Sequence, residues 1–303
     1  MISDSANSVA RKRRWQAIIL MLVSALSFSC MQLAIKKSGV GGEQPLMEQA
    51  FFRNLFSLIF VIPPIIKKKL APFGRREAQP YLLVRSITGY LAILCFFYAS
   101  NHAAIADANV LNKLSPAVVM LLSVLFLKER VTFIQILSLL LSLVGTCVVC
   151  GPAMNSAAIA VAAAILSAVF GGIAHTFVAL LKDKADPEVV IFHFSAFSVF
   201  ISALGMIKSF VLPRPEQLVM LVLIGVFGSL GQITLTFSYK LAPASQVSIF
   251  NYSGIVWSML IGVMFLGEAP KLETVFGGIL ITLASVLSAL LGDRITNTKG
   301  KEQ

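Results

Sequence analysis

The chain is divided into ten runs of about twenty apolar residues, and this division limits its possible folds more than any other feature. A helix of that length crosses the hydrocarbon core of a bilayer, whereas an open strand would leave backbone groups unbonded in lipid. The breaks between runs are short, and many contain Pro or Gly, so no room is left for a soluble domain. The predicted spans are residues 15–35, 47–66, 82–99, 105–127, 133–150, 157–181, 189–211, 218–239, 244–266 and 272–291.

The composition supports an all-α membrane protein in contact with a lipid bilayer. Only 13% of the residues are charged and 57% are hydrophobic, whereas a soluble domain carries roughly 25% charged residues. The net charge of +11 does not indicate a nucleic-acid partner, because the basic residues cluster in short breaks between apolar runs, as at 11–14 and 67–69. A nucleic-acid site would need a folded basic face.

The basic residues also predict how the chain is oriented. Most of the 25 Lys and Arg residues fall in alternate breaks that lie on the side of the N-terminal tail, and few fall in the other breaks. Cytoplasmic loops carry such an excess of positive charge. We therefore expect a multi-pass protein of the cell (inner) membrane with both termini in the cytoplasm.

An internal repeat is visible when the chain is shifted by 139 residues. Residues 89–129 then align without a gap on residues 228–268. The identities are Gly89/Gly228, Leu91/Leu230, Ala103/Ala242, Asn112/Asn251, Met120/Met259, Leu121/Leu260, Val124/Val263, Phe126/Phe265, Leu127/Leu266 and Glu129/Glu268. Since each half has five spans, the second half enters the membrane from the opposite side. The prediction is ten transmembrane helices as two inverted five-helix repeats, an architecture found in secondary transporters.

The fourth and ninth spans end in related motifs, Leu-Phe-Leu-Lys-Glu-Arg-Val-Thr at 125–132 and Met-Phe-Leu-Gly-Glu at 264–268, and Pro116 lies within the fourth span. With these motifs the chain resembles the drug/metabolite transporter superfamily, and within it the EamA-type transporters. In the second half Ile255 stands where the family pattern has that proline. The resemblance implies a tail at 1–14, EamA-like repeats at 15–150 and 157–291, and a second tail at 292–303. It identifies the fold and leaves the cargo open.

Lys113 is the first candidate for a substrate-binding residue. It lies deep in the fourth span, where an ionisable group indicates a functional site. Pro116 frees a backbone carbonyl nearby, so Asn112 and Lys113 could form a polar patch with Asn251 of the second half. The alternative is that Lys113 pairs with a carboxylate and only holds helices together.

The other candidate residues are less distinctive. Arg53 lies near the outer end of the second span, and Arg85, which begins the third span, could be an interfacial anchor or part of a gate. His175 could carry a proton or simply pack and donate a hydrogen bond. Tyr252 and Trp257 could stack on planar cargo, although most aromatic residues in spans serve packing or the interface.

The sequence predicts a secondary transporter that moves a small-molecule substrate by alternating access. Basic groups in the spans outnumber acidic ones, which favours amino acids or related anionic or zwitterionic metabolites. Drug or cofactor-type cargo is the alternative, followed by a passive channel. The scattered acidic residues and histidines do not form a catalytic group, so an enzyme is not expected. No Walker sequence, metal site or cofactor motif is found.

Overall fold

The computed structural model describes residues 2–38, 45–102, 111–150, 158–207, 209–266 and 272–291. Throughout these residues the regular structure is helical, without a strand. The elements are α1 (Ile2–Ser38), α2 (Leu46–Lys68), η1 (Arg76–Ala78), α3 (Gln79–His102), α5 (Ser115–Phe126), α6 (Phe133–Cys150), α7 (Ala158–Leu180), α8 (Pro187–Met206), α9 (Pro215–Leu241), α10 (Ala244–Val247), η2 (Ser248–Tyr252), α11 (Ser253–Leu266) and α12 (Leu272–Leu291).

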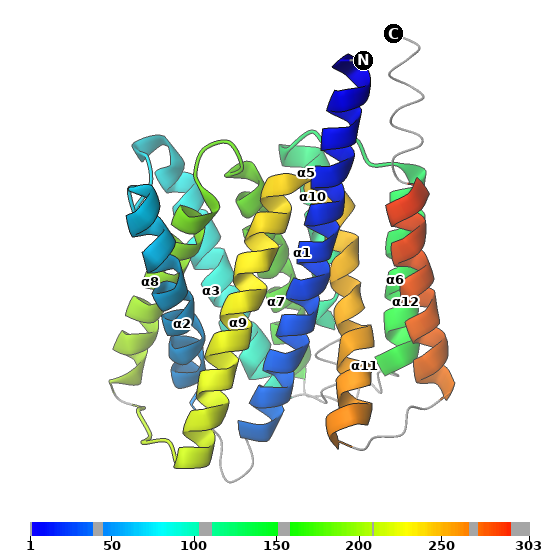
Figure 1. The fold of residues 1–303 in the computed structure, drawn as a ribbon. Coiled ribbons are helices and arrows are strands. Elements are labelled where there is room, and N and C mark those ends of the chain that lie inside the picture. The colour runs from blue at the N-terminus through cyan, green and yellow to red at the C-terminus, as the bar shows by residue number, and fades with distance from the viewer. Residues whose placement is uncertain are drawn as a thin grey trace.

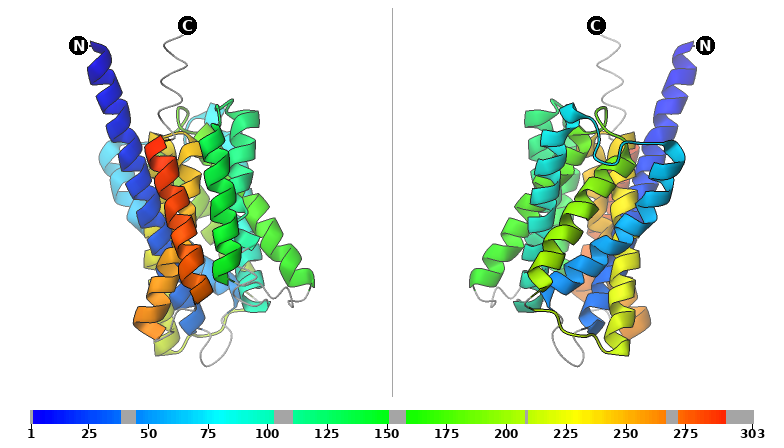
Figure 2. Two further views of the ribbon diagram at one scale, coloured as in Figure 1. Left: turned by 90° about the vertical axis from the view of Figure 1, so that its right-hand side faces the viewer. Right: turned by 90° about the vertical axis from the view of Figure 1, so that its left-hand side faces the viewer.

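The helices form one bundle and run along a common axis (Figures 1 and 2). The start of α1 and the end of α12 lie at the same end of this bundle (Figure 1). Among the described residues seven helices are long and apolar enough to cross a membrane, and three shorter apolar helices accompany them. The prediction of an all-helical, multi-pass membrane protein is therefore confirmed. The first part of the predicted span 105–127 lies outside the described residues.

Prolines set the beginnings of several helices. Pro187 and Pro215 each stand in the first turn of a helix, as does Pro116 in α5. Proline suits this position because the first turn needs no backbone N–H donor and the ring already holds a helical φ angle. The C-terminal end of α2 is fixed by a backbone cap instead. Lys69 adopts a left-handed conformation there, and its N–H donates to the carbonyls of Ile65 and Ile66.

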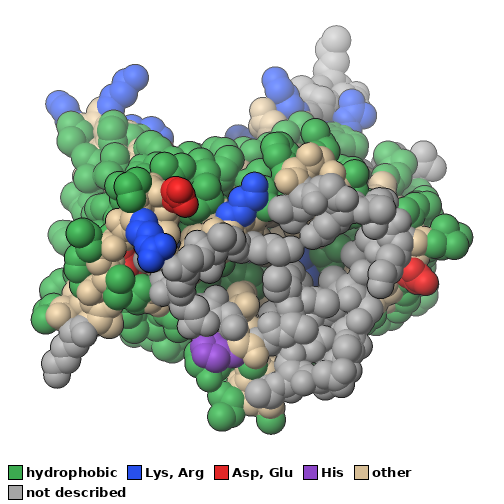
Figure 3. Space-filling model, turned by 90° about the horizontal axis from the view of Figure 1, so that it is seen from below, with side chains coloured by type: hydrophobic (Ala, Val, Ile, Leu, Met, Phe, Trp, Pro, Cys, Tyr) green, Lys and Arg blue, Asp and Glu red, His purple; other side chains and the backbone are tan. Residues whose placement is uncertain are grey.

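The outer surface of the bundle is apolar. Large hydrophobic side chains such as Phe133 and Met264 are about three-quarters exposed, and hydrophobic side chains dominate the outline of the described bundle seen from the end opposite the termini (Figure 3). Apolar surface of this extent is unfavourable in water and is matched by lipid. Polar side chains that would be unfavourable in lipid are buried inside the bundle, and they include Glu48, Arg53 and Arg85.

The helix contacts follow a regular pattern. α1 packs against α9 as α7 packs against α3, and α2 packs against α9 as α8 packs against α3. In the same way α5 contacts α7 and α11 contacts α1, while the pairs α2–α8 and α6–α12 complete the bundle. These named contacts map onto one another when α1, α2, α3, α5 and α6 are exchanged for α7, α8, α9, α11 and α12.

Candidate functional site

A cavity of about 140 Å³ lies inside the bundle, between helices of both halves of the chain. Residues of α1, α2, α3, α5, α7, α8 and α9 line it, together with the segments that precede α5 and α11. Its polar lining consists of Gln32, Arg53, Arg85, Asn112, Lys113, Ser115, Ser167, His175, Gln232 and Asn251. The structure therefore brings six of the eight predicted site residues together around one space.

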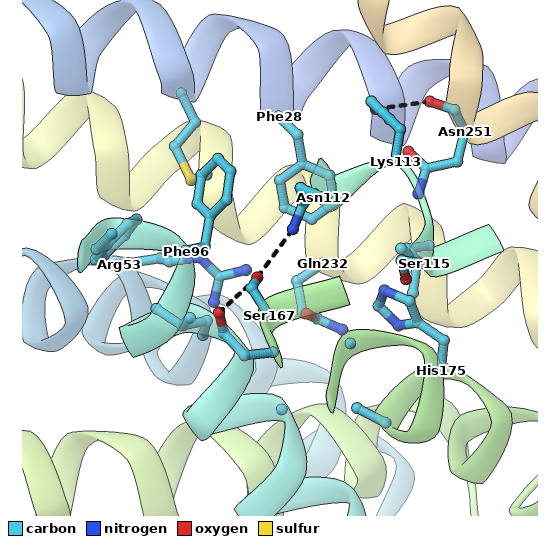
Figure 4. A pocket seen from close by; sticks show the side chains of 18 of the residues that line it. Phe28, Arg53, Phe96, Asn112, Lys113, Ser115, Ser167, His175, Gln232 and Asn251 are labelled. Atoms are coloured by element: carbon cyan, nitrogen blue, oxygen red, sulfur yellow. Dashed lines mark hydrogen bonds between the residues drawn. The ribbon is translucent and has the colours of Figure 1, made fainter. Parts of the chain in front are cut away.

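Two interruptions of regular α-helix bring Lys113 and Asn251 into contact. Residues 113 and 114 form a turn ahead of α5, and the 3-10 helix η2 separates α10 from α11. Pro116 lacks the N–H that would bond to the carbonyl of Asn112, which accounts for the first interruption. Lys113 Nζ, in the first interrupted segment, donates a hydrogen bond to the backbone oxygen of Asn251, in the second, over 3.1 Å (Figure 4). The pair of matched asparagines thus lies where both spans depart from regular α-helix.

A chain of hydrogen bonds fixes the side chain of Asn112. Asn112 Nδ2 donates to Ser167 Oγ over 2.9 Å, and Ser167 Oγ donates to the backbone oxygen of Ala92 over 3.0 Å (Figure 4). These bonds tie the segment before α5 to α7 and α3. They hold the amide of Asn112 at the cavity wall, and its orientation is set by helices from both halves of the chain.

Arg85 is the most deeply buried charge of the cavity. Only 1% of its surface is exposed, and its guanidinium carbon lies 4.0 Å from the centre of the Phe194 ring. Its Nε and Nη1 atoms have no hydrogen-bond partner among the described residues. Gly89 makes room for this group, because a Cβ atom at that position would lie 2.1 Å from Arg85 Nη1. Arg85 is therefore a cavity residue: α3 begins at Gln79 and carries it inside the bundle, so of the two roles considered for it, the position of an interfacial anchor is not the one observed.

Arg53 reaches the cavity from α2. It is 5% exposed, its Nη1 donates to Asn54 Oδ1 over 3.3 Å, and its guanidinium carbon lies 5.8 Å from the centre of the Phe28 ring. Gly228 lies against it, because a Cβ atom there would come within 2.9 Å of Arg53 Cγ. The two glycines that align in the sequence repeat, Gly89 and Gly228, thus each leave space for one buried arginine.

His175 lies on the α7 side of the cavity (Figure 4). Its ring stacks with that of Tyr239 at a centroid distance of 5.7 Å. Its Nδ1 atom is buried without a hydrogen-bond partner among the described residues. The aromatic contact shows that the ring packs, as one of the two predicted roles requires, while one face of the residue still reaches the cavity.

Tyr252 and Trp257 lie elsewhere. Tyr252 is fully buried in an apolar cluster with Met120 and Ile281, and Trp257 lines a separate groove near α12. Neither belongs to the lining of the cavity among the described residues, so the structure does not bring these two together with the other six predicted residues. Tyr252 follows Asn251 in the 3-10 helix η2, where successive side chains point about 120° apart.

Sequence reasoning missed several polar residues of the lining. Gln32, Ser167 and Gln232 all belong to it, and Ser167 bonds directly to Asn112. A glutamine within an apolar run could have been recognised in the sequence, because an uncharged polar group in a membrane helix usually hydrogen-bonds to another protein group and so faces the bundle interior. Serine gives little signal, since a serine in a helix often bonds to its own backbone.

The charge of the cavity is one-sided. Arg53, Arg85 and Lys113 line it, and no acidic side chain does so among the described residues. All three cations come from the first half of the chain, whereas the second half contributes neutral polar groups such as His175, Gln232 and Asn251. A cation inside a membrane protein is normally paired or marks the path of a ligand. The site is chemically suited to an anion.

Comparison with known proteins also indicates a membrane transporter. The model of the EamA-like transporter family matches residues 15–151 and 158–290. The chain is similar to the pseudopaline exporter CntI of Pseudomonas aeruginosa, at 30% identity over 271 residues that cover 89% of this chain and 94% of the exporter. It is also similar to human solute carrier family 35 member G1, at 26% identity over 89% of this chain and 77% of the carrier.

More distant similarities extend over nearly the whole chain. The riboflavin transporter of Rhizobium johnstonii is 23% identical and the match covers 94% of each protein. One crystal structure superposes with a TM-score of 0.77, covers 91% of this chain and 98% of its own, and is 20% identical in sequence, which establishes a shared fold. The chain is thus a multi-pass membrane transporter rather than an enzyme, and it belongs to the EamA-like transporter family.

Proposed function

We propose that this transporter is a secondary carrier for small organic anions, including amino acids and related carboxylates. The observation that carries the proposal is Arg85, whose guanidinium lies in the cavity with two nitrogen atoms that have no hydrogen-bond partner among the described residues. An arginine presents a planar fork of donors that matches a carboxylate. A carboxylate at this position would supply the missing acceptors.

Charge balance supports an anion over a cation. Arg53 and Arg85 are both buried and line the cavity, whose described lining contains no acidic side chain, and burying a cation without compensation is costly in a membrane protein. Cargo with one or more carboxylates would offset this cost while it is bound. A cationic drug would increase it, so drugs of that charge are disfavoured as cargo.

The proposed architecture is ten spans in two inverted five-helix repeats. It is supported by the helix contacts named above, which map onto one another when the two sets of five helices are exchanged. It is also supported by Asn112 and Asn251, which align in the sequence repeat and both lie where a span leaves regular α-helix. In carriers of this kind interrupted helices form the central site, and the halves rock around it. Asn112, Lys113 and Asn251, with Arg53, Arg85 and His175, are the proposed substrate-contacting residues.

The proposed location is the cell (inner) membrane, with both termini in the cytoplasm. The described basic residues of the N-terminal end of the bundle include Lys68, Arg76, Lys184 and Lys240, in addition to the cluster at 11–14. The positive-inside rule assigns such an end to the cytoplasm.

Planar cofactor-type cargo is a second candidate. Phe28, Phe96, Phe97 and Phe194 all line the cavity, and one relative is named a riboflavin transporter. Aromatic side chains stack on planar rings at an offset or edge to face. A carboxylate or phosphate on such a molecule would still meet the arginines, so the two candidates differ in the size and shape of the cargo.

Counterflow in proteoliposomes tests the proposal. Vesicles are loaded with one unlabelled solute class at a time (amino acids, carboxylates, flavins or organic cations), and uptake of the labelled solute is followed. Only a carrier exchanges labelled for unlabelled solute, so a passive channel gives no accumulation. We expect counterflow with an anionic or zwitterionic class and none with organic cations.

Arg85→Gln is the variant for this assay, with Arg76→Gln as the matched control. Arg76 is an exposed arginine in η1, outside the cavity. We expect Arg85→Gln to reduce counterflow by about tenfold or more, the equivalent of one lost charge-assisted contact, and Arg76→Gln to leave it unchanged. Wild-type counterflow in a folded Arg85→Gln protein, or exchange of cations only, would contradict the proposal.

A further inference from the structure

A second hollow lies between α1 and α12, away from the central cavity. Its volume is about 370 Å³, and its walls are apolar, with Trp15, Ile18 and Leu22 on one side and Val286, Ala289 and Leu290 on the other. Residues of η2 and α11, including Phe250 and Trp257, form its floor. α1 packs mainly against α9 and α11, and α12 packs mainly against α6, so the hollow is a groove between two separately packed parts of the bundle.

The groove opens toward the lipid. Trp15, Val286 and Leu290 are each exposed on the outer surface of the bundle. Its length along α1, from Trp15 to Leu22, is about 10 Å at the rise of an α-helix. One leaflet of the hydrocarbon core is about 15 Å thick. The groove is therefore about two-thirds as long as one leaflet is thick, a length that suits part of an acyl chain.

The upper end of the groove is basic. Arg14 Nη2 donates to the backbone oxygen of Ser288 over 2.9 Å, which links α1 to α12 at this end. Arg11, Arg14, Trp15, Ile18 and Leu22 are spaced i, i+3, i+4, i+7 and i+11, so they share one face of α1. The face that lines the groove therefore continues directly into two arginines at the membrane surface. Lys12 and Arg13 lie on other faces of the same turn.

We propose that this groove binds an anionic phospholipid. One acyl chain lies in the groove, Trp15 lies at the level of the interface, and the phosphate of the headgroup is held by Arg11 and Arg14. The chemistry matches at each level: apolar walls for the chain, an aromatic ring for the interface, and guanidinium groups for a phosphate. A neutral or zwitterionic lipid satisfies only the first two, so the site discriminates by headgroup charge.

Intrinsic fluorescence provides a direct test, because the chain has two tryptophans and both line this groove. The purified protein in neutral detergent is titrated with phosphatidylglycerol whose acyl chains are brominated, and separately with phosphatidylcholine carrying the same chains. Bromine quenches tryptophan emission on contact. We expect half-maximal quenching by phosphatidylglycerol at a roughly fivefold or more lower concentration than by phosphatidylcholine, as expected for basic residues near anionic lipid.

Two double variants separate a binding site from general charge attraction. Arg11→Gln with Arg14→Gln removes the charges on the groove face, and Lys12→Gln with Arg13→Gln removes the same charge from the other faces. We expect the first pair to abolish the preference for phosphatidylglycerol and the second to retain it. Equal quenching by both lipids in the wild type, or an equal loss in both double variants, would overturn the proposal.

A third variant tests the position of the chain. Ala289→Phe narrows the groove while both arginines remain. We expect it to weaken quenching by phosphatidylglycerol severalfold, and unchanged quenching would overturn the placement of the acyl chain. Melting temperatures of all variants, measured in the same detergent, identify any that fail to fold, and the arginine pair and Ala289→Phe provide independent readings of the same site.

Discussion

Lys113 Nζ lies 3.1 Å from the backbone oxygen of Asn251, and this hydrogen bond joins the interruption of one membrane span to the interruption of another. The two residues are 138 positions apart in the chain. Lys113 can therefore act in two ways, as a contact for cargo or as a link that holds the two halves together. Both roles use the same atoms, so transport and stability must be measured separately.

Lys113→Met is expected to reduce counterflow by about tenfold or more, since one charge-assisted contact of the bound anion is lost. The methyl-terminated side chain keeps much of the length of lysine, so the packing changes little. Counterflow and melting temperature are measured together, with Lys67→Met, an exposed position outside the cavity, as the control. Full transport in a stable variant would rule out a substrate role, and loss of the folded protein would assign Lys113 to the link.

Gly89→Ala is expected to reduce transport while the protein remains folded. The new Cβ atom would lie 2.1 Å from Arg85 Nη1, so the guanidinium of Arg85 must leave its present position beside Phe194. The matched control is Gly171→Ala, which also lines the cavity but whose Cβ atom would meet its nearest neighbour, Ser115 Oγ, at 3.4 Å. A fall of about tenfold in counterflow for the first variant, equal to about 1.4 kcal/mol, and little change for the second is the expected result. Equal effects would show that the position of Arg85 is unimportant.

Glu129→Gln is expected to lower the stability of the bundle by about 1 to 2 kcal/mol. Glu129 Oε1 accepts a hydrogen bond from the N–H of Ala244 at 3.0 Å, and Oε2 accepts one from the N–H of Ser245 at 2.9 Å and one from Ser245 Oγ at 2.6 Å. A glutamine has one acceptor oxygen and no charge, so it cannot keep all three bonds. Thermal unfolding in detergent measures the loss, and Glu77→Gln, at an exposed position, should shift the free energy by less than about 0.5 kcal/mol. Matching transitions for both variants would contradict the expected role.

The proposed orientation predicts which loops a membrane-impermeant thiol reagent can reach. In a protein whose native cysteines are replaced by serine, Glu216→Cys is expected to react in intact cells, because the start of α9 faces outward. Arg76→Cys is expected to react only after the membrane is opened. Both positions are exposed, so a difference in labelling reports their side of the membrane. The reverse pattern would invert the topology and would remove the argument from the basic loops.

The sequence predicts the helical, membrane-spanning character and the family, because both depend on composition, length and short motifs. It also predicts that Lys113 and Asn251 meet, since their spans are aligned by the repeat. It does not predict which face of a uniformly apolar helix points inward. Arg85 and Tyr252 illustrate this limit: the first enters the cavity two turns into α3, and the second turns away from it into a cluster with Met120. Neighbouring helices decide such orientations, and they are far apart in the sequence.

The cations of the cavity all belong to one half of the chain, which suggests that the two halves have different roles in the transport cycle. Arg53, Arg85 and Lys113 belong to the first half, and the second half brings neutral groups to the same cavity. In the proposed alternating-access cycle, the electrostatic field that attracts the cargo would move with the first half only. The cargo would then stay with the first half while the second half changes position around it. A chimera between two members of the family should therefore inherit its preference for cargo charge from the parent that supplies residues 15–150.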